Sequence, residues 1–253
     1  MDPGNRSGSG STMTCEHRSL ALDTVLAILT GHRPIIVLAP HPDDEALGCG
    51  GLLAHAFATH GAHVVLMTDG TQSHPGSTAW PAEARASLRA AELEASVREL
   101  GGSPADITRL GLPDAGMTSS DTGIPALARQ LSSLLSRLGA RCLFATAQTD
   151  PHCDHQATAE IARQAARLSG ARLFFYPIWS RWTDSDFRSG LPQTREVRLD
   201  TRDVRLIKAR AIAAHQSQLG DIICDDPEGF TLDPAFVRLF LHGDELFFEE
   251  HPE

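Results

Sequence analysis

The chain has 253 residues, 42% of them hydrophobic, and a formal net charge of -10. This length and composition fit one large domain with a buried core. Nucleic-acid binding and contact with an anionic membrane surface both need concentrated lysine and arginine, so the acidic balance argues against either partner. The sequence contains no apolar run of about eighteen residues, and we expect no transmembrane helix.

The start of the chain and its cysteines bear on location. Residues 1–11 are polar and rich in glycine and serine, without the apolar stretch of a signal peptide. We interpret residues 1–17 as a disordered tail or a non-native leader, with Met13 as a candidate natural start, and residues 18–253 as one domain. The five cysteines form no Cys-x-x-Cys pair, so neither a disulfide framework nor a thiolate zinc site is indicated. A cytoplasmic location is the simplest prediction.

Short apolar runs alternate with longer stretches of helical periodicity. The runs at 35–39, 64–68, 107–110, 142–145 and 173–176 predict five buried strands. Residues 84–95 and 127–138 repeat apolar side chains at helical spacing, and Gly101 and Gly139 are suited to end these helices. This alternation predicts a single α/β domain with a Rossmann-like parallel sheet and helices on both faces.

The pattern is less regular after Tyr176. Residues 179–192 resemble a long loop, 196–199 predict a strand, and 204–214 and 234–241 predict two helices. We interpret the acidic segment 244–250 as a solvated helix end. Residues 177–253 are therefore expected to form a cap on the same domain.

Two groups of histidines and carboxylates directly follow predicted strands. Ala-Pro-His-Pro-Asp-Asp-Glu at 39–45 follows the first strand, and Asp-Pro-His-Cys-Asp-His at 150–155 follows the fourth. Ligands of open α/β sheets bind beyond the carboxyl ends of the strands, where the strand order reverses. If the first and fourth strands flank that point, both groups converge in one crevice.

These residue types suit a catalytic zinc ion, which takes three histidine or carboxylate ligands and keeps one position open. His41 and Asp44, with either His152 or His155 from the second group, would supply such a site. Asp43 would remain as a free carboxylate that can take a proton from the attacking water.

A purely structural alternative exists for the first group. Asp43 or Asp44 could cap the helix that begins near Glu45, because aspartate is a favoured N-cap residue. Each group taken alone fits a turn or a cap. Their joint occurrence at two strand ends favours the metal site.

The sequence resembles the PIG-L/LmbE-like family of zinc-dependent N-acetylglucosaminyl deacetylases. Pro-His-Pro-Asp-Asp-Glu at 40–45 is similar to the family signature, and His-Cys-Asp-His at 152–155 resembles its His-Pro-Asp-His motif, with Cys153 replacing proline. Supporting similarities are Thr-Asp-Gly at 68–70, Arg-Ala-Ala-Glu at 89–92 with Leu-Gly at 100–101, Leu-Pro-Asp at 112–114, and Lys-Ala at 208–209 with His-Gln-Ser-Gln at 215–218. The resemblance covers the chain from residue 34 to residue 215.

The resemblance implies a metal centre and a reaction. His41, Asp44 and His155 would bind one Zn²⁺ per chain, or Fe²⁺ in its place, and Asp43 would be the general base. The implied reaction is hydrolysis of the acetamide of a small glycoside that contains N-acetylglucosamine, which yields acetate and a free amino sugar. The amino-sugar substrate is thus a small molecule, and the net charge favours a neutral or cationic one.

The resemblance also implies roles around the metal. His152 would stabilise the tetrahedral intermediate or protonate the leaving amine, Asp154 would orient it, and Arg89 would contact the substrate. Cys153 changes the stiffness of this loop, since proline would restrict the backbone there.

Several alternatives stay open. A thiol-conjugate amidase of the same family would cut a larger amide. A methyl-donor-dependent transferase would use Gly-Cys-Gly-Gly at 48–51, whereas the competing interpretation is that these small residues let a helix pack closely on the sheet. A non-catalytic sugar- or metal-binding module is the third. Trp179, Trp182 and Tyr176 either stack on a sugar or pack in the interior, and His215 lies either near the site or in the core.

Overall fold

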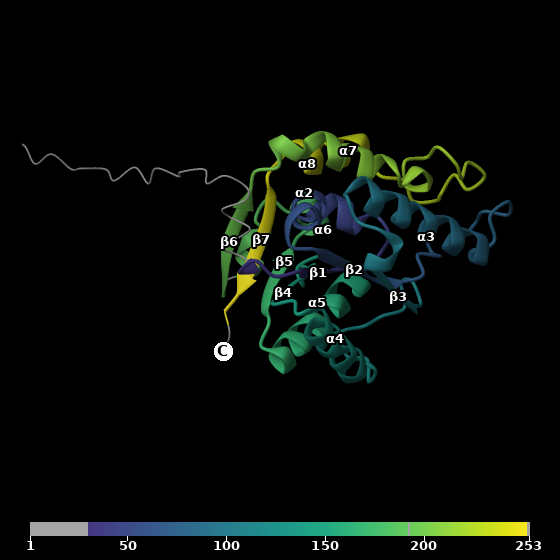
Figure 1. Cartoon of the computed structure of the whole chain (residues 1–253). Coiled ribbons are helices and arrows are strands. Elements are labelled where there is room, and N and C mark those ends of the chain that lie inside the picture. The colour runs from purple at the N-terminus through teal and green to yellow at the C-terminus, as the bar shows by residue number, and fades with distance from the viewer. Residues whose placement is uncertain (1–29, 192, 252–253) are drawn as a thin grey trace, which may run out of the picture.

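The computed structural model describes residues 30–191 and 193–251, so the predictions for residues 1–17 and Met13 lie outside the described residues. A seven-stranded sheet occupies the centre, with helices on both faces (Figure 1). The strands are β1 (Ile35–Ala39), β2 (Ala62–Thr68), β3 (Ile107–Leu112), β4 (Cys142–Thr146), β5 (Arg172–Tyr176), β6 (Thr194–Leu199) and β7 (Glu245–Glu250). The α-helices are α2 (Asp44–Thr59), α3 (Ala82–Glu99), α4 (Ile124–Leu138), α5 (Cys153–Ser169), α6 (Trp179–Thr183), α7 (Arg205–Ala213) and α8 (Pro234–His242).

The strand order is β3-β2-β1-β4-β5-β7-β6, and neighbours among β1 to β5 pair in parallel. The predicted single α/β domain with a Rossmann-like sheet is confirmed. Gly139 ends α4 in the left-handed conformation, with φ of 68°, as expected for a helix stop.

Both faces of the sheet are covered, which explains why β1 is a continuous apolar run. Ile35, Val37 and Ala39 point into one core cluster, formed with α2, α3, α7 and α8. Ile36 and Leu38 point into the other, formed with α4 and α5. Figure 1 shows these two helical layers above and below the sheet.

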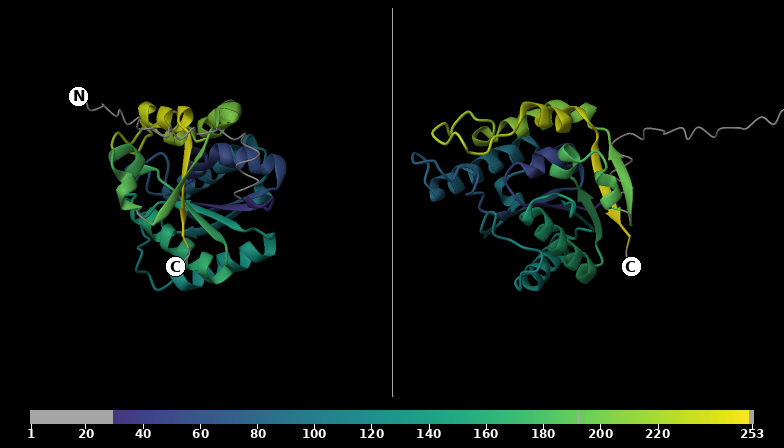
Figure 2. Two further views of the ribbon diagram at one scale, coloured as in Figure 1. Left: turned by 90° about the vertical axis from the view of Figure 1, so that its left-hand side faces the viewer. Right: turned by 180° about the vertical axis from the view of Figure 1, so that it is seen from behind.

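The interpretation of residues 244–250 as a solvated helix end is wrong. Glu245–Glu250 form β7, which pairs antiparallel with β5 and with β6 and completes the sheet beside its edge (Figure 2). Phe247 and Phe248 are buried in the two opposite clusters. The acidic residues fit because they are paired: Glu249 contacts Arg172 and Arg195 across the strands.

The segment 179–192 is also more regular than predicted. It contains α6 and a short 3-10 turn at Phe187–Gly190 instead of a continuous loop. These turns connect β5 to β6 and place α6 beside the carboxyl end of β5.

The glycines at 48–51 lie inside α2, so the packing interpretation is confirmed and the loop needed by a transferase is absent from this position. A Cβ at Gly48 would lie 2.3 Å from Cδ2 of Tyr176, and one at Gly51 would lie 2.3 Å from Cγ2 of Thr201. At Gly50 the close neighbour is Cγ of Lys208, at 2.9 Å. Because these three glycines have no side chain, β5 and α7 can approach α2 closely.

A buried ion pair joins this helix to the end of the chain. Nζ of Lys208 lies 2.7 Å from Oε1 of Glu245, and both side chains are almost fully buried. The Glu245 carboxylate also accepts hydrogen bonds from the backbone N–H groups of Gly51 and Leu52. A buried charge must be paired and hydrogen-bonded, and here three elements, α2, α7 and β7, supply the partners.

This packing predicts that Gly51→Ala lowers the free energy of unfolding by about 1–3 kcal/mol, because the new methyl group overlaps buried Thr201. Gly123→Ala is the control, since no atom lies within 4 Å of a Cβ there and φ is -77°. Urea denaturation of the two variants measures the difference. Equal stability of both variants would contradict the packing argument.

Candidate active site

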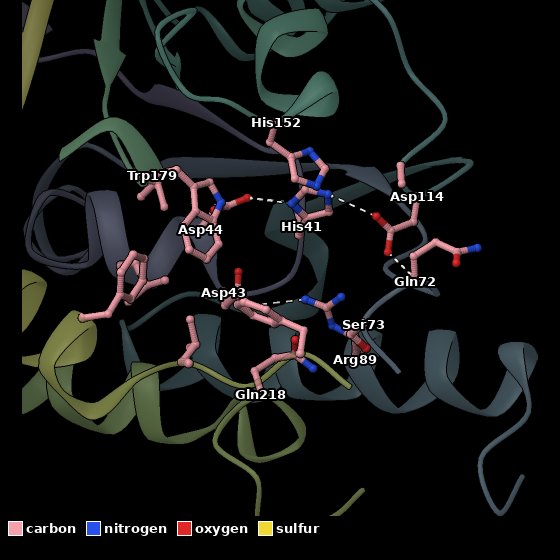
Figure 3. Close-up of a pocket in the computed structure, with 16 residues that line it drawn as sticks. His41, Asp43, Asp44, Gln72, Ser73, Arg89, Asp114, His152, Trp179 and Gln218 are labelled. Carbon is pink, nitrogen blue, oxygen red and sulfur yellow. Dashed lines mark hydrogen bonds and ion pairs between the residues drawn. The ribbon is translucent and has the colours of Figure 1, made fainter. Parts of the chain in front are cut away.

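The reversal of strand order falls between β1 and β4, as the sequence argument required. The groups at 39–45 and 150–155 therefore meet beyond the carboxyl ends of these two strands. The ring centroid of His41 lies 4.7 Å from that of His152 and 5.3 Å from that of His155. Figure 3 shows His41, Asp43, Asp44 and His152 facing one pocket.

His41, Asp44 and His155 offer one ligand atom each, and these atoms all lie within 4.8 Å of one another. Oδ2 of Asp44 is 3.3 Å from Nδ1 of His41 and 3.4 Å from Nε2 of His155. Asp44 and His155 are buried, and the side chain of His41 is 12% exposed. Two imidazoles and a carboxylate at this spacing can hold a divalent metal ion.

The far nitrogen of each imidazole contacts a carboxylate. Nδ1 of His155 lies 2.9 Å from Oδ2 of Asp150. Nε2 of His41 lies 3.0 Å from Oδ2 of Asp154 and 3.2 Å from Oδ1 of Asp114. Metal-bound histidines are commonly held this way, because the carboxylate sets the orientation and tautomer of the ring.

A buried nitrogen without a hydrogen-bond partner tests whether a metal ion fits. Among the described residues, Nε2 of His155 is such an atom, and it points at Asp44. An orphaned buried imidazole nitrogen is costly unless it has a ligand. A second trio, His41, His152 and Asp154, has similar spacing, but the Asp154 carboxylate already accepts from the backbone N–H groups of Ala115 and Met117. The orphaned nitrogen favours the trio that contains His155.

The electrostatics of this cluster also favour a cation. Burial lowers the pKa of His155, but Asp44 and Asp150 outweigh it and raise that pKa to about 9. Burial likewise acts against a charged His41, yet hydrogen bonds with Asp114, Asp154 and Asp44 raise its pKa well above the usual range. The carboxylates thus stabilise positive charge here, and a divalent ion can take the place of the imidazole protons.

Asp43 does not act as a helix cap. It occupies the N-cap position of α2, but its side chain makes no capping hydrogen bond, so this alternative is wrong for Asp43. Its φ of 130° is rare for a residue with a side chain and costs about 1–3 kcal/mol. The strained backbone turns the carboxylate into the pocket instead of along the helix.

The charge state of Asp43 is set by its surroundings. Burial raises the pKa of its carboxyl group, Arg89 lowers it, Asp44 raises it again, and the result is about 7. Oδ2 of Asp43 lies 3.4 Å from a terminal nitrogen of Arg89. A carboxylate with a pKa near neutrality can both accept and release a proton, which is what a general base requires.

His215 belongs to the support of Asp43 and does not line the pocket. Its Nε2 lies 2.8 Å from Oε1 of Glu45, and the other oxygen of Glu45 accepts from the backbone N–H of Asp43. Ser96 donates to Oε1 as well. This buried network holds the strained turn.

His152 occupies the N-cap position of α5. Its Nδ1 accepts a hydrogen bond from the backbone N–H of Asp154, so the neutral ring carries its proton on Nε2. The carboxylate of Asp154 is farther away, with Oδ2 4.0 Å from Nδ1. The orientation predicted for His152 is therefore provided here by the main chain of Asp154, while the side chain of Asp154 contacts His41.

Arg89 lines the pocket from α3 and is only 3% exposed. It donates to the backbone carbonyl groups of Gly70 and Pro42, both at 2.9 Å. These bonds join the turns that follow β1 and β2. Contact between Arg89 and a substrate stays a prediction.

Asp150 and Asp114 lie in the turns after β4 and β3, and the sequence motifs predicted no role for either of them. Asp150 holds His155, and Asp114 contacts His41 while its Oδ2 accepts from the backbone N–H of Gln72. Burial raises the pKa of Asp114, but His41 outweighs this and the pKa falls to about 2. Their position after β4 and β3 could have identified them. Ligands bind beyond the carboxyl ends of the strands, and this rule applies to the strand ends before Asp150 and Asp114 as it does to the strand end before His41.

The pocket is a cavity of about 220 Å³. Trp179 lines it, whereas Tyr176 is buried and donates its hydroxyl to the carbonyl of Leu38, so the two aromatic residues have different roles. The wall is completed by residues to which the sequence pattern assigned no role in a pocket: Leu47, Gln72, Ser73, Ala115, Ile178, Gln218, Phe230, Leu232 and Phe236. None of the helices in the described part of the chain is long and apolar enough to cross a membrane.

An α/β fold with a His/Asp cluster at the strand-order reversal defines a class of candidate metal-dependent enzymes, and comparison identifies the family. The family model PIG-L, described as GlcNAc-PI de-N-acetylase, matches residues 36–166, just over half of the chain. The chain belongs to this family. No curated protein sequence matches it.

Solved structures share the fold. The N,N'-diacetylchitobiose deacetylase of Pyrococcus horikoshii is 20% identical, with a TM-score of 0.63 over 92% of this chain and 93% of that one. The A40926 pseudoaglycone deacetylase Dbv21 is 21% identical, with a TM-score of 0.64 over 88% and 99%. The conserved protein TT1542 of Thermus thermophilus is 27% identical, with a TM-score of 0.58 over 87% and 94%.

The cluster predicts the effect of removing a ligand or its support. We expect His155→Ala to lose the bound divalent metal ion, and Asp150→Asn to weaken metal affinity about 10–100-fold, because the amide no longer holds the imidazole as firmly. Competition with a coloured chelator measures both. Asp121→Asn, an exposed carboxylate elsewhere, is the control.

A full metal complement in His155→Ala would contradict the ligand assignment. It would point instead to His152 or Cys153, the neighbouring donors on the same turn.

Proposed function

We propose that this protein is a zinc-dependent N-deacetylase. It would hydrolyse the acetamide of a small glycoside that contains N-acetylglucosamine and release acetate and a free amino sugar. The observation that carries the proposal is the position of Asp43: a buried carboxylate 3.4 Å from Arg89, beside a trio of metal-type ligands, in a pocket. The PIG-L family match and the named deacetylases of the same fold support it.

The donor set suits zinc, since His41, His155 and Asp44 leave a coordination position open to a substrate. A bound zinc ion would act as a Lewis acid toward the amide carbonyl. Fe²⁺ is an alternative occupant of the same donor set.

The side chains of the chain supply the proton transfers. Asp43 takes the proton from the attacking water, and Arg89 keeps its carboxylate in the pocket. His152 offers the N–H of Nε2 from the opposite strand end, and as a neutral ring it can stabilise the tetrahedral intermediate by a hydrogen bond. The proton that Asp43 took from the water can then pass to the leaving amine, whereas protonation of the amine by His152 would require its imidazolium form. The two groups come from β1 and β4, so the reacting amide would lie between them.

The charge of the pocket bears on the substrate. Asp43, Asp44 and Asp114 line it beside Arg89, a bound divalent ion would offset two of these carboxylates, and the whole chain carries -10. The acidity of the chain as a whole disfavours a strongly anionic substrate, so a neutral or cationic amino-sugar derivative fits best.

Asp43→Asn tests the general base. Asparagine keeps the shape but does not accept the proton, so turnover should fall about a hundredfold or more. Metal content should stay unchanged because Asp43 is not among the proposed ligands. Acetate release from N-acetylglucosamine glycosides, with elemental analysis of the same preparation, measures both. Near-normal turnover with normal zinc content would remove Asp43 from the mechanism.

The pKa of Asp43 also predicts the pH profile. The base must be ionised, so kcat/KM should rise with pH and level off above an apparent pKa at or below about 7. A bound cation would move this value downward, since it stabilises the carboxylate. Rates from pH 5 to 9 trace the curve. A profile that is flat below pH 7 and falls with rising pH would have the opposite sign and count against a carboxylate base.

A further inference from the structure

Two chemically different walls meet at the candidate metal centre. Gln72, Ser73, Arg89, Asp114 and Gln218 form a polar wall. The apolar wall consists of Leu47, Ile178, Trp179, Phe230, Leu232 and Phe236. In Figure 3, Trp179 lies on the Asp44 side of His41, and Gln72 and Asp114 lie on the opposite side.

The apolar wall begins directly at the ligands. Leu47 follows Asp44 by three residues in the first turn of α2 and therefore lies on the same face of the helix. The backbone N–H of Ile178 donates to Asp150, the residue that holds His155. Both apolar side chains line the pocket next to the metal ligands.

Aromatic side chains extend this wall outward. The Trp179 ring packs on Phe236, with centroids 5.0 Å apart, and against Phe230 at 5.6 Å. Phe236 is buried, whereas Trp179 and Phe230 keep part of their surface accessible. Accessible aromatic surface inside a pocket favours an apolar partner.

The wall is held in place before any ligand arrives. Phe230 and Leu232 come from the segment between α7 and α8, which projects beside the turn before α3 (Figures 1 and 2). The backbone N–H of Phe230 donates to the carbonyl of Ser73, and the Asp225 carboxylate accepts from the N–H groups of Thr78 and Ala79. A preformed wall binds without a large ordering cost.

We propose that the apolar wall binds the acyl chain of the substrate and that the preferred acyl group is longer than acetyl. This inference rests on the proposed amide hydrolysis. When the scissile carbonyl lies at the metal ligands, the acyl chain and the amino sugar extend from it in opposite directions. The sugar hydroxyls need hydrogen-bond partners, which only the polar wall supplies, because burying them on hydrocarbon is costly. The acyl side is therefore the apolar side.

The test uses glucosamine acylated with acetyl, butanoyl, hexanoyl and octanoyl groups. The amine product is identical throughout, so an amine-reactive dye reports every rate on one scale. Each buried methylene should raise kcat/KM about fourfold, so burial of only two of the four extra methylenes of hexanoyl should make it exceed acetyl by at least about tenfold. A rate that stays level or falls beyond acetyl overturns the inference and leaves the proposed deacetylase intact.

Variants locate the effect. In Trp179→Ala and in Phe230→Ala, the ratio of kcat/KM for the hexanoyl substrate to kcat/KM for the acetyl substrate should fall to about one, because the apolar wall is then disrupted. Trp182→Ala is the matched control: Trp182 also contacts Phe236, at 5.7 Å, but is 40% exposed and does not line the pocket. Melting temperatures identify variants that fail to fold, and Phe230, which is only partly buried, serves where Trp179→Ala is unfolded.

Two further measurements separate the outcomes. If octyl N-acetylglucosaminide outperforms the methyl glycoside while acyl length has no effect, the wall holds an aglycone and the inference is wrong. Binding of the product acids can be measured without turnover. Hexanoate should bind the wild-type pocket at least about tenfold more tightly than acetate. Failure of every amide to react would overturn the proposed function, and equal binding of the two acids would overturn the inference on its own.

Discussion

Asp150 is a fully buried carboxylate, and a charge removed from water must receive hydrogen bonds from the protein. Its oxygens contact Nδ1 of His155, the backbone N–H groups of Ile178 and Ser180, and the hydroxyl of Ser180. These contacts connect the turn after β4 with the turn after β5. One carboxylate thereby aims His155 at Asp44 and places Ile178 and Trp179 at the wall of the same pocket. The candidate metal centre and the candidate acyl wall consequently share one support.

A second buried network has a comparable role on the other side of the pocket. Glu45 receives hydrogen bonds from Ser96 and from the backbone of Asp43, and its contact with His215 brings in the segment after α7. The backbone of Asp43 has an unfavourable φ, and such strain persists only where surrounding contacts determine the conformation. Burial of the same region raises the pKa of Asp43. The features that make Asp43 costly to the fold are thus those that suit it to proton transfer.

The local sequence pattern predicted a helix or strand correctly where the burial of that element follows a regular repeat or where a residue type marks its end. The run at 35–39 identified β1 because both faces of the sheet are covered, and Gly139 identified the end of α4 because glycine tolerates the left-handed conformation. The same approach failed for β7. Its glutamates suggested a solvated end, but Glu245 is neutralised by Lys208, 37 residues away in the chain, and Glu249 by arginines on neighbouring strands. Pairing between distant residues leaves no periodic trace in the sequence.

The candidate site likewise contains residues that the sequence predicts and residues that only the tertiary structure brings to it. The motifs at 39–45 and 150–155 predicted that His41, Asp43, Asp44 and the two histidines of the second group lie together, because ligand types at two strand ends are visible in the sequence alone, and the structure brings them together. Which far carboxylate holds each imidazole depended on how β1, β3 and β4 lie side by side, since Asp114 and Asp150 become partners only through that packing. The apolar wall depended on tertiary structure still more: Phe230 lies in an irregular segment far along the chain from the metal ligands, and Phe236 lies in the short helix that follows it. Chemistry that resides in residue type can be read along the chain, whereas the shape of the space around it arises only when distant segments pack together.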